Sequence, residues 1–492
     1  MCKEIYLVSN PETYNFKKVR NEIGMNVLIY LGHQGLVRHF NSAIIAFSEK
    51  GHTVNVIIDN AKLVQKYESL DVIDEWQKYG IIILKDFPSL LISFPKSDLT
   101  ALWRRSLNSL YHYLFYFKTE HPSKTLAYRN IKGMPKLVRW SMVFLTKLRP
   151  LSKLVDKKLT KKENNRTIST DLLTRLTSLN PDLIITLPLV WQNIRDCDLI
   201  LAAKMKKIPV VSYVPSWDNF STKGRIITKP DKIFTWNESL KLDAVKIHSC
   251  RNSEVEVVGA IVFDGLFEWK KTFKTQVLRD ERLRADYVLY VCSSNSIIEG
   301  EIGERDESQL ILKTALALKN SKRSKPIKLF IRSHPLGKLP DLREKAKKLG
   351  CSYIIEELHQ GLTFEREGRE DFYEQLAYSK AVIGLNTSAF MEAAILNKIC
   401  ISTADLLEKP KKTFGHLKHL RESKFIKFPH SVAEISNFFD EKENILNENY
   451  KTLATNFVKK FIRPNGIEDS ASNQLVKSAE NLLNPSDIKK DN

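Results

Sequence analysis

The chain has 492 residues, of which 43% are hydrophobic and 27% are charged, and its formal net charge is +20. This length predicts two domains of roughly 200 residues each, and the composition is that of a globular protein. No apolar run approaches the roughly 18 residues of a membrane span, and the first residues lack the apolar core of a signal peptide, so we expect a cytoplasmic protein.

The excess of lysine and arginine predicts an anionic partner: a nucleic acid, a membrane surface or an anionic substrate. No helix-turn-helix, RNP, KH or zinc-finger pattern occurs, so no specific nucleic acid is expected, and a basic nucleic-acid-binding scaffold is kept as the non-enzyme alternative. The six cysteines lack the spacing of a zinc site or a disulfide framework. We therefore expect reduced, structural cysteines and no metal site.

The first predicted unit is a strand, a helix and a second strand. The strand Asn26–Leu31 is followed by a tight polar turn, by an amphipathic helix from Leu36 to Lys50 and by the strand Thr53–Asp59. A polar turn that directly follows a buried strand is a common position for binding groups. This turn supplies three candidate site residues: Gly32, His33 and Gln34.

Residues 97–165 interrupt the alternation of strands and helices. Arg and Lys are interleaved here with Trp, Tyr and Phe, and the pattern predicts helical pieces with basic and aromatic faces. Such faces fit an anionic membrane surface or a lipid-linked acceptor, which would place the protein peripherally on the inner face of the cell membrane. Two alternatives remain open: a helical insertion packed on the core with a solvated basic face, and a contact with nucleic acid.

The alternation then resumes and leads to a polar, aromatic loop, residues 215–224. The elements expected before it are the helix Asp171–Leu179, the strand Leu183–Thr186, the helix Asp198–Lys206 and the strand Val210–Tyr213. The loop contributes Trp217, Asp218 and Asn219 as candidates. We expect the N-terminal domain to cover residues 1–265, including the insertion, and a linker to cover residues 266–285.

The C-terminal domain, residues 286–440, is expected to open with a buried strand from Tyr287. That strand runs into a turn with Ser293 and Ser294. A later apolar strand beginning at Lys328 ends in three basic or titratable candidates: Arg332, His334 and Lys338. Cations outside the carboxyl end of a strand are well placed to meet a diphosphate.

The segment 381–401 predicts a strand, a turn, a helix that begins near Ser388 and a second strand. The turn contains Asn386, Thr387 and Ser388, and a helix that opens with uncapped N–H groups can receive a phosphate. The ordinary alternative is that these side chains merely cap the helix. Glu392 lies one turn further on, where we expect a surface-facing carboxylate that could reach a ribose. His416 is a further cleft candidate, and residues 441–492 predict helices and a polar tail.

These motifs resemble the GT-B glycosyltransferases, in particular the branch with the CDP-glycerol glycerophosphotransferases and the UDP-N-acetylglucosamine 2-epimerases. The resemblance rests on a Gly-His pair in the first loop, on Gly51-His52 before the second strand, on the His-Pro that follows a later strand, and on the Ser/Thr turn before a helix with a Glu. It implies an α/β fold of two Rossmann-like domains that face a central cleft.

The resemblance also implies a function: metal-independent transfer of a sugar from a nucleotide-activated donor to a glycan or lipid-linked acceptor, in bacterial surface polysaccharide synthesis. The nucleotide sugar is then a substrate and no cofactor is expected. Arg332 and Lys338 would hold phosphate oxygens, and Glu392 would bind the ribose. The turn that would cradle the diphosphate consists of Asn386, Thr387 and Ser388.

For the chemistry, His33 is the preferred base toward the acceptor, with Asp218 as its rival. His334 would contact the nucleotide, protonate the leaving group or simply shape the strand end. Two enzymes of the same fold are alternatives, a CDP-polyol phosphotransferase and a nucleotide-sugar 2-epimerase. The phosphotransferases usually have Asp-Tyr-Ser-Ser in the turn where this chain has Leu-Asn-Thr-Ser at 385–388, which favours glycosyl transfer over phosphopolyol transfer.

Overall fold

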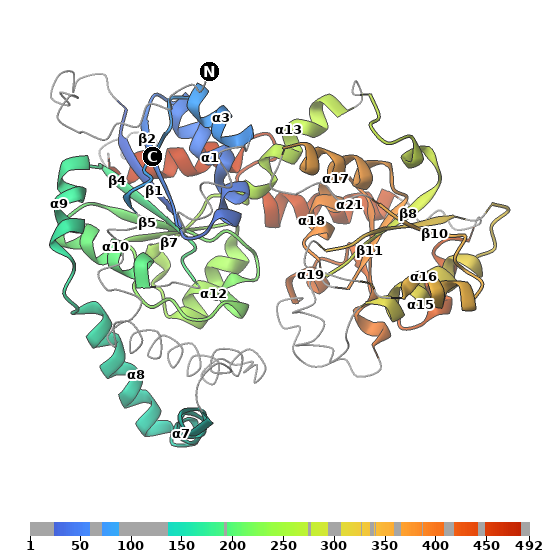
Figure 1. Ribbon diagram of the computed structural model, residues 1–492, viewed down its shortest axis with the longest axis horizontal. Coiled ribbons are helices and arrows are strands. Elements are labelled where there is room, and N and C mark those ends of the chain that lie inside the picture. The colour runs from blue at the N-terminus through green and yellow to red at the C-terminus, as the bar shows by residue number, and fades with distance from the viewer. Residues whose placement is uncertain are drawn as a thin grey trace.

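The computed structural model describes residues 24–59, 71–87, 136–190, 194–273, 277–293, 307–325, 327–334, 339, 341–358, 366–385, 387–407, 418–440 and 448–483. Two parallel sheets, one in each half of the chain, lie side by side with helices around them (Figure 1). The predicted architecture of two Rossmann-like α/β domains is confirmed.

The N-terminal sheet has seven strands in the order β3-β2-β1-β4-β5-β6-β7, all parallel. Its strands are β1 Asn26–Leu31, β2 Thr53–Ile58, β3 Ile82–Ile83, β4 Leu183–Leu187, β5 Val210–Tyr213, β6 Lys232–Thr235 and β7 Val255–Val257. The inner strands are runs of Val, Ile and Leu because helices bury both faces of a parallel sheet. The chain leaves β1 toward one edge and later returns at β4 toward the other, so a ligand is expected to bind beyond the carboxyl ends of β1 and β4.

The helices of this half bury one apolar face each. They are α1 Val37–Glu49, α3 Asp71–Lys78, α9 Thr170–Leu179, α10 Ile194–Met205, α11 Asn219–Thr222 and α12 Glu238–His248. In α1 the buried side chains Phe40, Ile44 and Phe47 recur at spacings of four and three, which places them on the face toward the sheet. This orientation turns Arg38 and His39 away from the core center and toward the end of β1.

The C-terminal sheet has six strands in the order β10-β9-β8-β11-β12-β13. They are β8 Tyr287–Val291, β9 Lys328–Arg332, β10 Ile355–Glu357, β11 Ala381–Gly384, β12 Ile399–Ser402 and β13 Ile426–Lys427. The surrounding helices are α15 Ser308–Lys319, α16 Leu342–Lys348, α17 Arg366–Tyr378, α18 Ala389–Ile395, α19 Lys418–Glu422 and α20 Val432–Asn437. The reversal of strand order here lies between β8 and β11, and their carboxyl ends are therefore where a ligand is expected to bind.

Helices from both ends of the second half connect the two sheets. They are α13 Asp264–Thr272, α21 Glu448–Phe457 and α22 Ala471–Leu483. The final helix, α22, packs on α1 of the N-terminal half. Asp264 ties this arrangement together, since it accepts hydrogen bonds from Arg463 (2.7 Å) and from the Ser472 hydroxyl (2.6 Å) in a buried site.

Two helices, α7 Lys136–Lys147 and α8 Arg149–Asn164, stand apart from both sheets at the bottom of Figure 1. They are the described part of the basic, aromatic segment, whose residues 97–135 lie outside the described chain. No helix in the described ranges is long and apolar enough to span a membrane. The five cysteines within those ranges, Cys197, Cys250, Cys292, Cys351 and Cys400, are buried and unbridged.

Candidate functional site

The first loop of the site follows β1 and depends on a glycine. The Gly32 amide donates a hydrogen bond to the Leu187 carbonyl at the end of β4 (2.7 Å), and a Cβ at Gly32 would lie 2.9 Å from the same oxygen. A side chain does not fit there, so glycine lets the chain turn against β4. The turn leaves His33 and Gln34 half-buried at the carboxyl edge of the sheet.

The loop after β5 supplies the second group from this half. The Ser216 hydroxyl donates to the Asp218 carboxylate (2.6 Å), which fixes that carboxylate one residue before α11. Asp218 also lies near His39, because its charge acts on the pKa of that imidazole. Trp217 is only 7% exposed and packs in the hydrophobic core, and its contact with the acceptor remains a prediction.

Arg38, in the first turn of α1, connects the two halves electrostatically. Its Nε donates to the His39 imidazole (3.2 Å), and its charge lowers the pKa values of His33 on its own half and of His334 on the other. It also acts on Glu392 in α18. Sequence analysis did not select Arg38, because its role depends on a group of the other half, Glu392, and no local pattern marks it.

Arg332 ends β9 and is held in a fixed orientation. Its Nη1 donates to the Gln375 side-chain oxygen of α17 (2.7 Å), and its guanidinium lies 4.7 Å from the centre of the Phe372 ring. Burial lowers its pKa to about 10, so the group remains a cation at neutral pH. The second terminal nitrogen, Nη2, is buried and has no hydrogen-bond partner in the described part of the chain. Arg332 therefore keeps one side of its fork available for an oxyanion.

Glu392 is less exposed than the sequence suggested. Its Oε2 is buried and has no hydrogen-bond partner among the residues that the structure describes. Burial raises the pKa of Glu392 to about 7, and the charges of Arg38 and Arg332 partly oppose this rise. The expectation of a surface-facing carboxylate is wrong, because α18 packs on α17 and α21 and the Oε2 atom of Glu392 is buried. Glu392 changes its protonation state near neutral pH.

Hydrogen bonds within the chain occupy the first amides of α18, while the role of Thr387 and Ser388 at a phosphate remains a prediction. Thr387 Oγ1 accepts a hydrogen bond from the Ala389 amide (3.2 Å), and the Met391 amide donates to the Ser388 carbonyl (2.8 Å). The Ser388 residue itself is exposed. The first amides of this helix thus have partners within the chain, so side-chain cations are better placed than α18 amides to bind a diphosphate.

Five of the residues selected from the sequence each carry a buried polar atom without a hydrogen-bond partner in the described ranges. These atoms are Gln34 Oε1, Asn219 Oδ1, Ser293 Oγ, Arg332 Nη2 and Glu392 Oε2. Buried polar atoms are almost always hydrogen-bonded in folded proteins. Gln34, Asn219 and Ser293 follow the carboxyl ends of β1, β5 and β8. Arg332 is the last residue of β9, and Glu392 lies in α18 after β11. A polar ligand that enters between the halves would satisfy such atoms.

The imidazole rings of His33 and His334 both have lowered pKa values. Burial lowers the pKa of His33, and the positive charges of Arg38 and Lys223 lower it further. Burial and Arg38 likewise lower the pKa of His334. Both rings are therefore neutral at neutral pH. A neutral ring can accept a proton, which suits a general base better than a proton donor to a leaving group.

Four candidates lie outside the described chain: Ser294, Lys338, Asn386 and His416. Their assignment remains a prediction. Within the described ranges no group of three or more His, Cys, Asp or Glu side chains is arranged to hold a metal ion.

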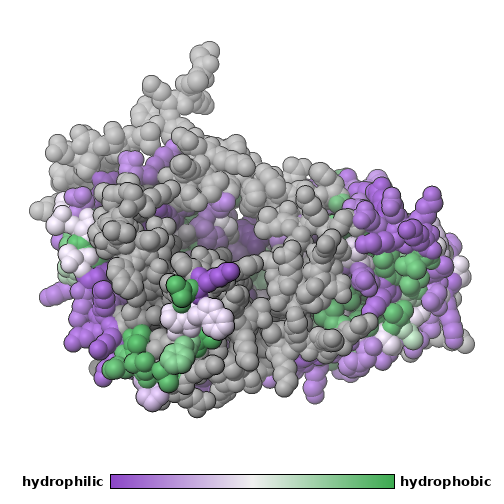
Figure 2. Space-filling model, turned by 60° about the horizontal axis from the view of Figure 1, so that its bottom comes forward, coloured by the Kyte–Doolittle hydropathy of each residue, from purple (hydrophilic) through white to green (hydrophobic). Residues whose placement is uncertain are grey.

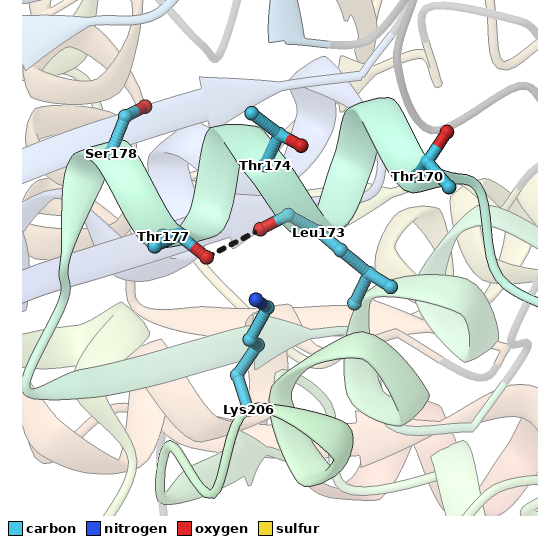
Figure 3. Close-up of a pocket in the computed structure, with 6 residues that line it drawn as sticks. All are labelled: Thr170, Leu173, Thr174, Thr177, Ser178 and Lys206. Carbon is cyan, nitrogen blue, oxygen red and sulfur yellow. Dashed lines mark hydrogen bonds between the residues drawn. The ribbon is translucent and has the colours of Figure 1, made fainter.

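A shallow hollow on the N-terminal half, beside α9, lies apart from the candidate site (Figure 3). One side of α9 and Lys206 form it, and its lining residues are Thr170, Leu173, Thr174, Thr177, Ser178 and Lys206. Thr177 uses its hydroxyl to bond the Leu173 carbonyl within the helix (2.9 Å). Leu179 and Lys206 directly precede the strands β4 and β5, so the hollow approaches the amino edge of the sheet. Ligands of open α/β sheets bind at the opposite edge.

Comparison with known proteins supports the fold assignment. No family model matches the chain, and no curated protein matches it in sequence. UDP-GlcNAc 2-epimerase from Neisseria meningitidis, solved with UDP-GlcNAc, matches with a TM-score of 0.53 and 15% identity, over 93% of this chain and 100% of that one. A second UDP-N-acetylglucosamine 2-epimerase has a TM-score of 0.51 and 13% identity, over 95% and 98%. S. aureus MnaA, solved with UDP, has a TM-score of 0.50 and 13% identity, over 94% and 97%.

These similarities, together with the two sheets and their topology, define the fold of the protein. The chain has the GT-B fold, as the sequence motifs predicted, and it resembles the epimerase branch of that fold.

Proposed function

We propose that this protein is a glycosyltransferase that moves a sugar from a nucleotide-activated donor to a glycan or lipid-linked acceptor in bacterial surface polysaccharide synthesis. One observation carries the proposal. Arg332 Nη2 and Glu392 Oε2 are buried polar atoms without partners in the described chain, and Arg38 of the other half lies close enough for its charge to act on Glu392 together with that of Arg332. Cations and a carboxylate in that arrangement match a nucleoside diphosphate.

The donor would lie mainly on the C-terminal half. Arg332 offers a fixed guanidinium to the diphosphate, and Arg38 adds a second cation from the other half. Glu392, in its ionised form, accepts hydrogen bonds from the ribose hydroxyls. Lys338 and the turn of residues 386–388 are proposed as further phosphate contacts. This division leaves the N-terminal loops to bind the acceptor, with Gln34 and Asn219 as its hydrogen-bonding groups.

The reaction needs a base and a stabilised leaving group. The acceptor oxygen attacks the anomeric carbon, the bond from that carbon to the diphosphate oxygen breaks, and the diphosphate leaves with the electron pair. His33 takes the proton from the acceptor hydroxyl, since its ring is neutral and half-buried. Arg332 and Arg38 stabilise the charge that develops on the diphosphate. No metal is required in this scheme.

A nucleotide-sugar 2-epimerase is the second candidate. The solved structures with TM-scores of 0.50 or more described above are UDP-GlcNAc 2-epimerases or a protein solved with UDP. An epimerase binds the same class of nucleotide and needs no acceptor. The base would then act on a proton of the sugar ring in place of an acceptor hydroxyl.

The two candidates differ in what happens when no acceptor is present. A thermal-shift panel of UDP-, GDP-, CDP- and CMP-linked sugars, with CDP-glycerol included, identifies the nucleotide by its stabilising effect. The selected compound is then incubated with enzyme alone and with membrane-derived acceptors, and the products are followed by NMR. Transfer that depends on acceptor supports the proposal. Inversion at C2 without acceptor would replace it by epimerisation.

The pKa of Glu392 predicts a pH dependence of donor binding. Below pH 7 the carboxyl group is increasingly protonated and loses acceptor capacity, so affinity for a nucleotide sugar should rise by up to about tenfold from pH 6 to pH 8. Burial lowers the pKa values of His33 and His334 below the ordinary 6.5, so both rings are mostly neutral in the upper part of this window. Calorimetry measures the effect. The Glu392→Gln variant should bind more weakly and without this slope, and a wild-type affinity that does not change with pH would contradict the ribose role.

A further inference from the structure

The helices α7 and α8 carry several large hydrophobic side chains that are exposed to solvent. Leu137 is 85% exposed, Trp140 74% and Phe144 63%, and Leu151 and Leu154 on α8 are also exposed. Single apolar residues are also exposed elsewhere, as Leu242 and Tyr353 are, and these are normal, but several on two consecutive helices form a set. We call the exposed side of these two helices the α7–α8 surface.

The spacing on the α7–α8 surface is helical. Leu137, Trp140 and Phe144 are separated by three and four residues, and Leu151 and Leu154 by three. Each set thus lies on one face of its helix. The two helices stand away from the sheets in Figure 1, and Figure 2, with that side turned forward, shows hydrophobic side chains gathered beside hydrophilic ones at its lower left.

The same stretch is strongly basic. Residues 136–162 contain nine lysines and arginines and a single acidic residue, Asp156. Lys157, Lys158 and Lys161 on α8 are exposed beside the apolar residues. A helix with an apolar face, an aromatic residue and a rim of lysines has the composition of segments that lie in the interface of an anionic membrane.

We propose that the α7–α8 surface docks on an anionic phospholipid bilayer, with Trp140 and Phe144 in the interface and the lysines at the head groups. The positive charge of the α7–α8 surface, together with its apolar side chains, favours this partner over the alternatives. A second copy would bring two basic surfaces together, which is repulsive. A nucleic acid would attract the lysines, but it offers nothing to a face made mainly of leucine. The proposal does not depend on glycosyl transfer, and it would bring the N-terminal half to the lipid.

Co-sedimentation with vesicles tests the proposal on the full chain. The vesicles contain phosphatidylcholine alone, or phosphatidylcholine and phosphatidylglycerol in equal parts. We expect binding to the anionic vesicles, little binding to the neutral ones, and release as the salt rises from about 0.05 to about 0.5 M, because screening shortens the reach of the lysines.

Two variants, each with a matched control, locate the contact. The apolar variant is Trp140→Ser with Phe144→Ser, and its control replaces exposed residues elsewhere, Leu242→Ser with Tyr353→Ser. The charge variant removes three exposed lysines of α8, and its control removes three exposed lysines of α16 in the other half. The charge variant is Lys157→Gln, Lys158→Gln and Lys161→Gln, and its control is Lys345→Gln, Lys347→Gln and Lys348→Gln.

Each α7–α8 variant should lower the partition coefficient at least tenfold, while the controls stay within about twofold of wild type. Thermal midpoints close to wild type establish that all variants fold. Three results would overturn the proposal: equal binding to neutral and anionic vesicles, equal losses in the α16 control, or undiminished binding in the α7–α8 variants. Wild-type protein that ignores vesicles and dimerises through this surface would also overturn it.

Discussion

The His33→Ala variant is expected to lower kcat by about 10²-fold or more and to leave the affinity for the donor nearly unchanged. His33 sits in the loop after β1, which Gly32 presses against β4, while the donor groups Arg332 and Glu392 lie in the other half. Removal of the ring therefore removes the proton acceptor without touching those groups. Steady-state rates and calorimetry on the same preparation separate the two effects.

Asp218 provides the control, since it is the rival base. Asp218→Asn should keep more activity than His33→Ala, because the Asp218 carboxylate is engaged by the Ser216 hydroxyl. The wild-type rate should also decrease at a pH below 6.5, the ordinary imidazole pKa, because His33 then gains a proton. The pH–rate profile of His33→Ala should lack this decrease. A spared rate in His33→Ala together with an inactive Asp218→Asn would exchange the two roles.

The Arg332→Met variant is expected to weaken binding of the nucleotide sugar by about 10- to 100-fold, since hydrogen bonds to charged groups contribute about 1.5–3 kcal/mol. The methionine keeps the length of the side chain beside Phe372 but removes the fork that Gln375 orients. Calorimetric titration of wild type and variant gives the ratio directly. Arg332→Lys should recover part of the affinity, because it restores the charge without the planar geometry.

Arg421 is the matched control for this change. It also lies against a phenylalanine, with its guanidinium 4.0 Å from the centre of the Phe428 ring, and it pairs with Asp405. Arg421→Met should leave nucleotide affinity unchanged. If Arg332→Met binds the nucleotide as well as wild type does, the diphosphate is not held at the end of β9.

The positions of several strands could be predicted from the sequence, because buried parallel strands are continuous apolar runs. Asn26–Leu31, Val210–Tyr213 and Ala381–Gly384 are strands in the structure with the bounds read from the sequence. A buried run that ends in a polar turn marks the carboxyl edge of a sheet, and this local rule selected Gln34 and Arg332. Both prove to carry buried polar atoms without partners in the described chain.

The remainder of the site depends on contacts between halves, which no local pattern encodes. Arg38 looked like an ordinary helix residue, and its importance arises only because α1 brings it near Glu392. The burial of Glu392 depends on the packing of α18 on α17 and α21. The Thr387 cap was indicated by its residue type, but the choice between a cap and a phosphate ligand depends on hydrogen-bond geometry. The packing of α22 on α1 is likewise a long-range contact.

Hydrogen exchange with and without the nucleotide sugar chosen by the thermal-shift panel tests the central claim most directly. A donor held between the halves should slow exchange in the loop after β1, at the end of β9 and in α17–α18, and should leave α9 and α16 unchanged. Stabilisation by none of the nucleotide sugars, or protection confined to the α9 hollow, would contradict the proposed site.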